Sequence, residues 1–231
     1  MFDPSQRRAA RIAGLTYPLT ILILMAAFGH FYAPYLVWDN VAETARNIAA
    51  HQLDYRIYIA GAMLNGIGLL ILPAAFYILL RPIGRGLALF AAWSRLVYAV
   101  MWFAEICYGL AALRIVSGAA YLQVFDPERL RALAGLQLAS GWDAYYVGLT
   151  FYGLSTAVFA CLWFQSRYIP RWLALWGLAA SLFEGVCGFA YLTFPSFGSV
   201  VSVNYYELPL MLFELPLSIL LLWKGFRPSR A

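Results

Sequence analysis

The residues best suited to chemistry are three ionisable side chains that fall inside long apolar stretches. Arg95 lies within the run Gly86–Gly109, and Glu184 and Glu214 lie within two later apolar stretches. A single unpaired charge at the centre of a membrane-spanning helix costs roughly 2.5 to 3.5 kcal/mol on insertion scales, so partners or water are expected beside it. Ionisable groups in this setting are candidates for a functional site.

These side chains offer complementary chemistry. Arginine stays protonated and can hold a carboxylate through two parallel N–H bonds, so we expect one glutamate to be the permanent partner of Arg95. The other glutamate has no counter-charge, and in low dielectric we expect it to hold a proton that it can deliver to a substrate. Glu214 or Glu184 is thus a candidate general acid that Arg95 orients. Glu105 or Asp143 is a candidate base that receives the proton. The alternative is a structural Arg–Glu pair plus a neutral glutamate bonded to backbone.

Depth counting places these groups near one another. At about 1.5 Å per residue from the basic residues that end each span, Arg95 and Glu214 lie about 15 Å from the inner surface and Glu184 about 20 Å. Asn65 reaches a comparable depth in the second span. We therefore expect one polar group of residues near the membrane midplane.

A second polar layer is expected nearer the outer surface. By the same count, its members lie about 25 to 30 Å from the inner face; they are His30, Glu105, Asp143 and Glu207. Such a set could bind a divalent cation or act as an acid/base set, but no pair shows ligand spacing within one helix. Interfacial residues solvated by water explain the layer more simply, so we predict no metal site.

Aromatic residues inside the spans could line an apolar pocket whose ring faces stabilise a cation. Ordinary packing explains these rings equally well. We assign four of these aromatic residues and two polar residues of the spans to substrate binding. They are Trp93, Tyr98, Trp102 and Tyr146, with Asn65 and Glu207.

The elements that must position these residues are predicted to be membrane-spanning helices. The chain is 63% hydrophobic and 12% charged, whereas globular proteins average about 25% charged residues. Apolar runs predict an all-α polytopic bundle of about six transmembrane helices, forming one integral membrane domain over residues 1–231. The first span is interpreted as retained and not as a signal peptide. The predicted spans are 11–33, 56–80, 85–112, 142–165, 171–193 and 206–224.

The distribution of basic residues predicts the orientation. Six spans put both termini on one side, and arginine and lysine are more numerous on that side than in the opposite loops. We therefore expect both termini to be cytoplasmic, in a multi-pass protein of the inner (cytoplasmic) membrane. The residues on the cytoplasmic side are Arg7, Arg8, Arg11, Arg81, Arg85, Arg167, Arg171, Lys224, Arg227 and Arg230.

The two long outer connections are each predicted to contain a short amphipathic helix. Asn40 precedes Val41 with Glu43 at the third helical position, which is the spacing of a capping box. Asp126 precedes Pro127, a residue favoured at the first helical position because its missing N–H costs nothing there. These helices are expected to lie along the outer membrane surface or to pack on the loops as ordinary connecting helices.

An internal similarity at an offset of 86 residues predicts a parallel repeat. The turn Arg81–Leu89 aligns with the turn Arg167–Leu175 through shared arginine, proline and Leu-Ala-Leu positions. The repeat would comprise residues 54–112 and 143–193. Chance matching between apolar sequences is the alternative.

Several classes of function are excluded by the residues present. The basic residues sit in small groups and form no continuous stripe, which argues against nucleic acid. Cys107, Cys161 and Cys187 form no CxxC pair, which argues against a disulfide framework or a zinc site. The single lysine, Lys224, ends the last span and leaves no site for a retinal Schiff base within the bundle. The sequence also has no P-loop, GxSxG or HExxH motif, so no cofactor is expected.

Five segments resemble a bacterial multi-pass membrane family that is catalogued only as a domain of unknown function. They are Arg11-Ile-Ala-Gly-Leu15, the turn Arg81–Leu89, Ser94-Arg95-Leu96-Val97, Phe125-Asp-Pro-Glu-Arg-Leu130 and Tyr168-Ile-Pro-Arg-Trp172. The resemblance covers nearly the whole chain and implies the same multi-pass fold. The family often has a glutamate just after the Arg-Leu-Val run, where this chain has Tyr98 and Ala99.

Three functions are compatible with these features. The preferred hypothesis is a membrane enzyme that protonates, isomerises or cyclises an apolar lipid or isoprenoid in an intramembrane pocket. A proton-coupled transporter is the first alternative, supported by the repeat and by Pro209 and Pro216 in the last span. A non-catalytic membrane partner is the second alternative. The expected partners are membrane lipids and an apolar small molecule, and the oligomeric state is left open.

Overall fold

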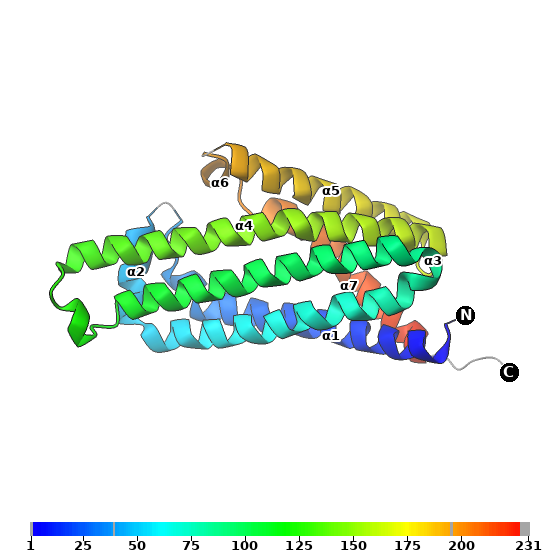
Figure 1. Cartoon of the computed structure of the whole chain (residues 1–231), viewed down its shortest axis with the longest axis horizontal. Coiled ribbons are helices and arrows are strands. Elements are labelled where there is room, and N and C mark those ends of the chain that lie inside the picture. The colour runs from blue at the N-terminus through cyan, green and yellow to red at the C-terminus, as the bar shows by residue number, and fades with distance from the viewer. Residues whose placement is uncertain (1, 39, 195, 227–231) are drawn as a thin grey trace. The chain divides into compact units, whose positions relative to one another are not determined.

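A computed structural model describes residues 2–38, 40–194 and 196–226, and all regular elements within these ranges are helices (Figure 1). The predicted all-α class is confirmed. The elements are α1 (Pro4–Phe31), η1 (Ala33–Tyr35), α2 (Val41–Ala50), α3 (Gln52–Ile115), η2 (Ala120–Leu122), α4 (Pro127–Ser166), α5 (Arg171–Thr193), α6 (Phe197–Val200) and α7 (Asn204–Phe226).

The chain divides into two compact units, and each is described by itself. Unit 1 consists of Met1–Thr20, Ile67–Ala99 and Val147–Ala231, and unit 2 consists of Ile21–Gly66 and Val100–Tyr146. Unit 1 therefore holds α5, α6 and α7 with parts of α1, α3 and α4. Unit 2 holds α2 and the remaining parts of the three long helices. The single integral domain with a parallel repeat stays a prediction.

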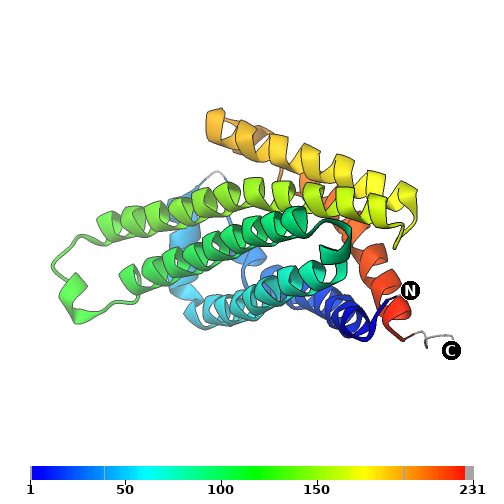
Figure 2. The same ribbon diagram turned by 45° about the vertical axis from the view of Figure 1, so that its right-hand side comes forward.

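Five of the described helices are long and apolar enough to cross a membrane. α3 accounts for two of the six predicted spans, because its chain leaves helical geometry at Gly84, with a φ of −163° and a ψ of 88°. Figures 1 and 2 show α3 turning back on itself once along its length. The multi-pass helical architecture expected from the sequence is thus confirmed.

The first predicted cap is present at the start of α2. The Asn40 side chain accepts a hydrogen bond from the backbone N–H of Glu43 at 3.0 Å. A full capping box would also have the Glu43 carboxylate accept a hydrogen bond from the Asn40 backbone N–H. Here the Asn40 N–H donates to the Val37 carbonyl, and the Glu43 carboxylate pairs with Arg46. One side-chain cap therefore defines where α2 begins.

The second predicted outer helix is not a separate element. Asp126 caps its start as expected, accepting hydrogen bonds from the N–H groups of Glu128 and Arg129 at 2.8 and 3.3 Å. From Pro127, however, α4 continues without interruption to Ser166. The segment has no proline beyond its first residue, and a helix tolerates Gly135 and Gly141 at a modest cost in stability.

Close backbone packing orders the helices of unit 1. α7 packs against α5, and α4 approaches α5 at Gly153. A Cβ atom on Gly153 would lie 2.7 Å from the Ser181 carbonyl oxygen and 2.9 Å from the Gly185 backbone nitrogen. No side chain fits in that space. Because Tyr152 and Glu184 directly precede the two glycines, this contact brings their backbones together.

The substitution Gly153→Ala is therefore expected to destabilise the protein. Its methyl group must push α4 away from α5, and overpacking of this kind costs about 1 to 3 kcal/mol. The midpoint of thermal unfolding in detergent measures the effect. Gly185→Ala is the matched control, because a Cβ atom there meets nothing within 4 Å. Equal midpoints for the two variants would contradict the close contact.

Candidate functional site

Five helices each contribute one side chain to a buried polar group in unit 1, here called the Arg95 cluster. Its members are Tyr17 of α1, Arg95 of α3, Tyr152 of α4, Glu184 of α5 and Glu214 of α7. Arg95 and Glu184 are each 2% exposed, and Glu214 is 6% exposed. The structure thus brings together three of the ionisable residues that the sequence singled out.

Arg95 is held by α4 through hydroxyl groups and an aromatic ring. Its Nε donates to the Ser155 hydroxyl at 3.3 Å, and its Nη2 donates to the Thr156 hydroxyl. Its guanidinium carbon lies 3.6 Å from the centre of the Tyr152 ring, which is a close cation–π contact. The Ser155 hydroxyl also donates to the carbonyl of Ala91, one turn before Arg95, and so ties α4 to α3.

Glu214 is held by two tyrosine hydroxyl groups. Its Oε1 accepts a hydrogen bond from Tyr17 at 2.9 Å and another from Tyr152. Tyr152 therefore joins Arg95 to Glu214, with its ring against the guanidinium and its hydroxyl on the carboxylate. Hydrogen bonds donated to a carboxylate favour its ionised form.

Glu184 has no such donors on one of its oxygens. Its Oε2 is buried and has no hydrogen-bond partner among the described residues. The side chain is close enough to Glu214 and Arg95 to interact with both electrostatically. Beside it on α5, Ser181 directs its hydroxyl to the Gly177 carbonyl of its own helix. Glu184 is thus the acidic member of the cluster with an oxygen left for other chemistry.

The predicted direct ion pair between Arg95 and a glutamate is not formed. No nitrogen of Arg95 lies within 4.0 Å of a carboxylate oxygen of Glu184 or Glu214. Nε and Nη2 of Arg95 donate instead to Ser155 and Thr156, and the hydroxyl of Tyr152, whose ring lies against the guanidinium, donates to Glu214. The charges of Arg95 and Glu214 therefore interact through the tyrosine.

Two predicted aromatic residues of unit 1 lie in different settings. Tyr98 is buried, and its ring contacts the Tyr152 ring edge-on at a centroid distance of 4.6 Å. Trp93 is 63% exposed at the surface of the unit. It lies two residues before Arg95, and residues two apart on a helix do not share a face. Trp93 therefore does not line a buried pocket with Arg95.

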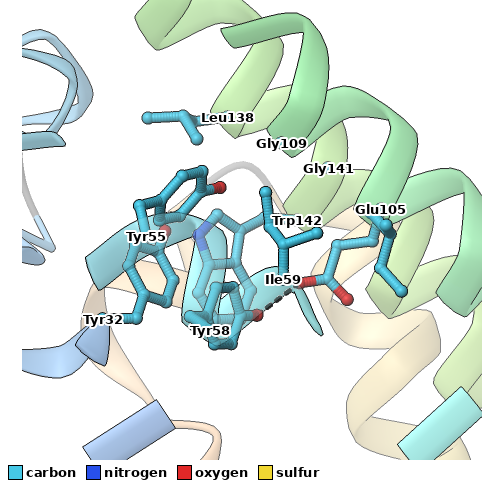
Figure 3. A pocket seen from close by; sticks show the side chains of 10 residues that line it. Tyr32, Tyr55, Tyr58, Ile59, Glu105, Gly109, Leu138, Gly141 and Trp142 are labelled. Atoms are coloured by element: carbon cyan, nitrogen blue, oxygen red, sulfur yellow. Dashed lines mark hydrogen bonds between the residues drawn. The ribbon is translucent and has the colours of Figure 1, made fainter. Parts of the chain in front are cut away.

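Several other candidates belong to unit 2, so the structure does not place them against the Arg95 cluster. Asn65 and Tyr146 are buried, and Trp102 donates its indole N–H to the Ala62 carbonyl at 2.9 Å. Asp143 is exposed. Glu105 accepts a hydrogen bond from Tyr58 at 3.2 Å beside a small cavity (Figure 3). The role of Glu105 or Asp143 as a receiving base stays a prediction.

The predicted outer layer does not assemble into one group. His30 is exposed, and Glu207 is partly buried in unit 1, whereas Glu105 and Asp143 belong to unit 2. Within residues 2–38, 40–194 and 196–226, no three His, Cys, Asp or Glu side chains gather as a metal site would require. The layer thus consists of residues in separate surroundings.

Three residues that bind Arg95 or Glu214 were not singled out from the sequence, and Tyr152 was only one of many aromatic residues within the spans. Tyr17, Ser155 and Thr156 are polar residues inside spans, the same signal that identified Arg95. A hydroxyl group costs much less to bury than a charge, so this signal is weaker for tyrosine, serine and threonine. Their role is identified only in the structure, which shows the partner that each one binds on another helix.

Removing the Tyr152 hydroxyl should weaken the cluster while leaving the ring against Arg95. A hydrogen bond to a charged group contributes about 1.5 to 3 kcal/mol, so Tyr152→Phe should lower stability by that amount. Tyr152→Leu should lose a further contribution of about 2 kcal/mol, because it also removes the cation–π contact. Chemical unfolding in detergent micelles would measure both changes. Equal stabilities for the Phe and Leu variants would mean that the ring does not hold Arg95.

The comparisons with known proteins agree with the expected resemblance. Residues 12–225 match the model of a family described as a domain of unknown function, DUF4386. No curated protein matches the chain, and no solved structure matches it either. Because the matched region covers nearly the whole sequence, the chain belongs to the DUF4386 family.

Proposed function

We propose that this protein is an integral membrane enzyme that performs acid/base chemistry on an apolar lipid or isoprenoid, with Glu184 as its general acid. The observation that carries the proposal is the buried Oε2 of Glu184, which has no hydrogen-bond partner among the described residues and belongs to a side chain within electrostatic reach of Arg95. Buried ionisable residues inside spans are expensive and typically mark functional sites.

Charge balance supports the assignment of Glu184. Glu214 receives two O–H bonds, which stabilise a carboxylate, and one carboxylate neutralises the charge of Arg95. A second negative charge in the same low-dielectric space would be uncompensated. Glu184 therefore holds a proton at rest, and that proton is available for transfer.

The reaction that fits such a group is a shift of a carbon–carbon double bond. The Glu184 carboxylic acid adds its proton to one alkene carbon, and the other alkene carbon becomes cationic and balances the charge of the carboxylate formed. That carboxylate then removes a proton from a carbon next to the cationic centre, which moves the double bond and restores the acid. The step needs no co-reactant, and cyclisation would begin with the same protonation.

A proton-coupled transporter is the second candidate. One buried carboxyl group that changes its protonation state is the minimum requirement for coupling. α7 contains Pro209 and Pro216, which remove backbone donors near Glu214 and favour a bendable helix. A non-catalytic partner protein would need only the structural contacts of the cluster.

The proposal places the protein in a bacterial inner membrane with both termini cytoplasmic. Its support is the excess of arginine and lysine near the termini and in the two turns at Arg81–Arg85 and Arg167–Arg171. Membrane lipids and an apolar small molecule are the partners that this location supplies.

The substitution Glu184→Gln should abolish turnover without unfolding the protein, because it keeps the shape of the side chain and removes its proton. General acid catalysis contributes about 100- to 10,000-fold in rate, so a loss of at least about 100-fold is expected. Membranes containing the wild type or the variant are extracted, and their lipids are compared by chromatography and mass spectrometry. An isomerase product has an unchanged mass and a shifted retention time.

Two further variants complete this experiment. Glu128→Gln makes the same change at an exposed position in the first turn of α4 and should retain the product. Glu184→Asp keeps an acid and should retain part of the activity. A product formed equally by wild type and Glu184→Gln would reject the enzyme. Proton uptake by proteoliposomes that is lost in Glu184→Gln, with lipids unchanged, would favour the transporter.

A further inference from the structure

Unit 2 contains a cavity lined by aromatic rings and one carboxylate (Figure 3). The rings belong to Tyr32, Tyr55, Tyr58 and Trp142, and the carboxylate belongs to Glu105. The centre of a water-sized sphere can occupy about 20 Å³ of the cavity. A single water molecule needs about 10 to 15 Å³ by this measure, so the space suits one small molecule.

The carboxylate of Glu105 is only partly satisfied. Its Oε1 accepts a hydrogen bond from the Tyr58 hydroxyl at 3.2 Å. Its Oε2 is buried and has no hydrogen-bond partner among the described residues. No lysine, arginine or histidine nitrogen that the structure describes lies within 4.0 Å of either oxygen. An ionised Glu105 therefore lacks a counter-charge from the described residues, and a cation bound beside it would supply one.

The tyrosine rings form a rigid wall of this cavity. Tyr32 and Tyr58 are stacked with centroids 4.6 Å apart, and Tyr55 packs against them at 5.3 and 5.6 Å. Tyr55 is fixed against α3, because a Cβ atom on Gly109 would lie 2.7 Å from its hydroxyl oxygen. Preorganised ring faces attract ammonium groups through their quadrupoles.

We propose that this cavity binds a small ammonium cation, either ammonium itself or methylammonium. The Glu105 carboxylate at the cavity wall supplies the opposite charge, and the aromatic rings, together with Ile59, Ile106 and Leu138, enclose the cation. The proposal goes beyond the acid/base function assigned to unit 1, because it uses only residues of unit 2.

The size and composition of the cavity select this ligand over other cations. Ca²⁺ and Mg²⁺ need about six or more oxygen ligands, and the described part of the chain gathers no three side chains that could ligate a metal ion. An ammonium group needs only a few hydrogen bonds, and aromatic faces can replace the rest of its hydration. Tetramethylammonium is much larger than one water molecule and exceeds the available volume.

The first test measures ligand selectivity with the wild-type protein. Thermal unfolding in detergent is followed in ammonium, methylammonium or tetramethylammonium chloride, each compared with sodium chloride at the same ionic strength. A ligand that binds the folded state raises the midpoint as its concentration increases. Ammonium and methylammonium should give a saturable rise, and tetramethylammonium should give none. No rise with any cation, or an equal rise with tetramethylammonium, would overturn the proposal.

The second test changes the cavity. Glu105→Gln keeps an acceptor for Tyr58 but removes the charge, and it should weaken methylammonium binding by about tenfold or more, since hydrogen bonds to charged groups contribute about 1.5 to 3 kcal/mol. Glu128→Gln is the matched control at an exposed position of the same unit and should bind as the wild type does. An unchanged affinity in Glu105→Gln would overturn the proposal.

A third variant tests the volume without removing the charge. A Cβ atom on Gly141 would lie 3.6 Å from Cγ of Glu105 and 3.5 Å from Cβ of Tyr108, which are ordinary contacts. Gly141→Ala should therefore fold normally and narrow the cavity, weakening methylammonium more than ammonium. The proposal would be overturned if Gly141→Ala bound ammonium and methylammonium each with the same affinity as the wild type does. None of these binding measurements depends on the lipid product of the Glu184 experiment, so the two proposals can fail separately.

Discussion

The contact of Tyr152 with both Arg95 and Glu214 is the interaction on which unit 1 depends. A guanidinium cannot be deprotonated in a protein, so its charge must be met inside the bundle. The Tyr152 ring meets one face of it, and the Tyr152 hydroxyl connects to the carboxylate of Glu214. The hydroxyl groups of Ser155 and Thr156 accept hydrogen bonds from Nε and Nη2 at its edge. One residue of α4 thereby links α3 to α7.

This arrangement leaves the two glutamates with different roles. Glu214 is fixed by donors from α1 and α4, so it serves as the permanent counter-charge. Glu184 comes from α5, which is held tightly to α4 at Gly153, yet one of its oxygens has no hydrogen-bond partner among the described residues. Two carboxyl groups in different environments are a recurring basis of acid/base chemistry. The functional proposal follows from this difference between them.

Much of this site could be predicted from charge and depth, and the rest depended on side-chain direction. Arg95, Glu184 and Glu214 were identified because charges in apolar spans are rare and costly. The role of Tyr152 was not predicted, because a tyrosine within a span is equally compatible with packing. Trp93 was assigned to the pocket, but its rotation on α3 exposes it. The cap at Asn40 was predictable because it is local in sequence, whereas the continuity of α4 was obscured by its glycines.

The most direct test of the account is the infrared spectrum of the purified protein near neutral pH, because protonated and ionised carboxyl groups absorb at different frequencies. We predict a component of the buried carboxylic acid band that disappears in Glu184→Gln and persists in Glu214→Gln. If that component is instead lost in Glu214→Gln and kept in Glu184→Gln, Glu214 holds the proton, and the division of roles around Arg95 is wrong.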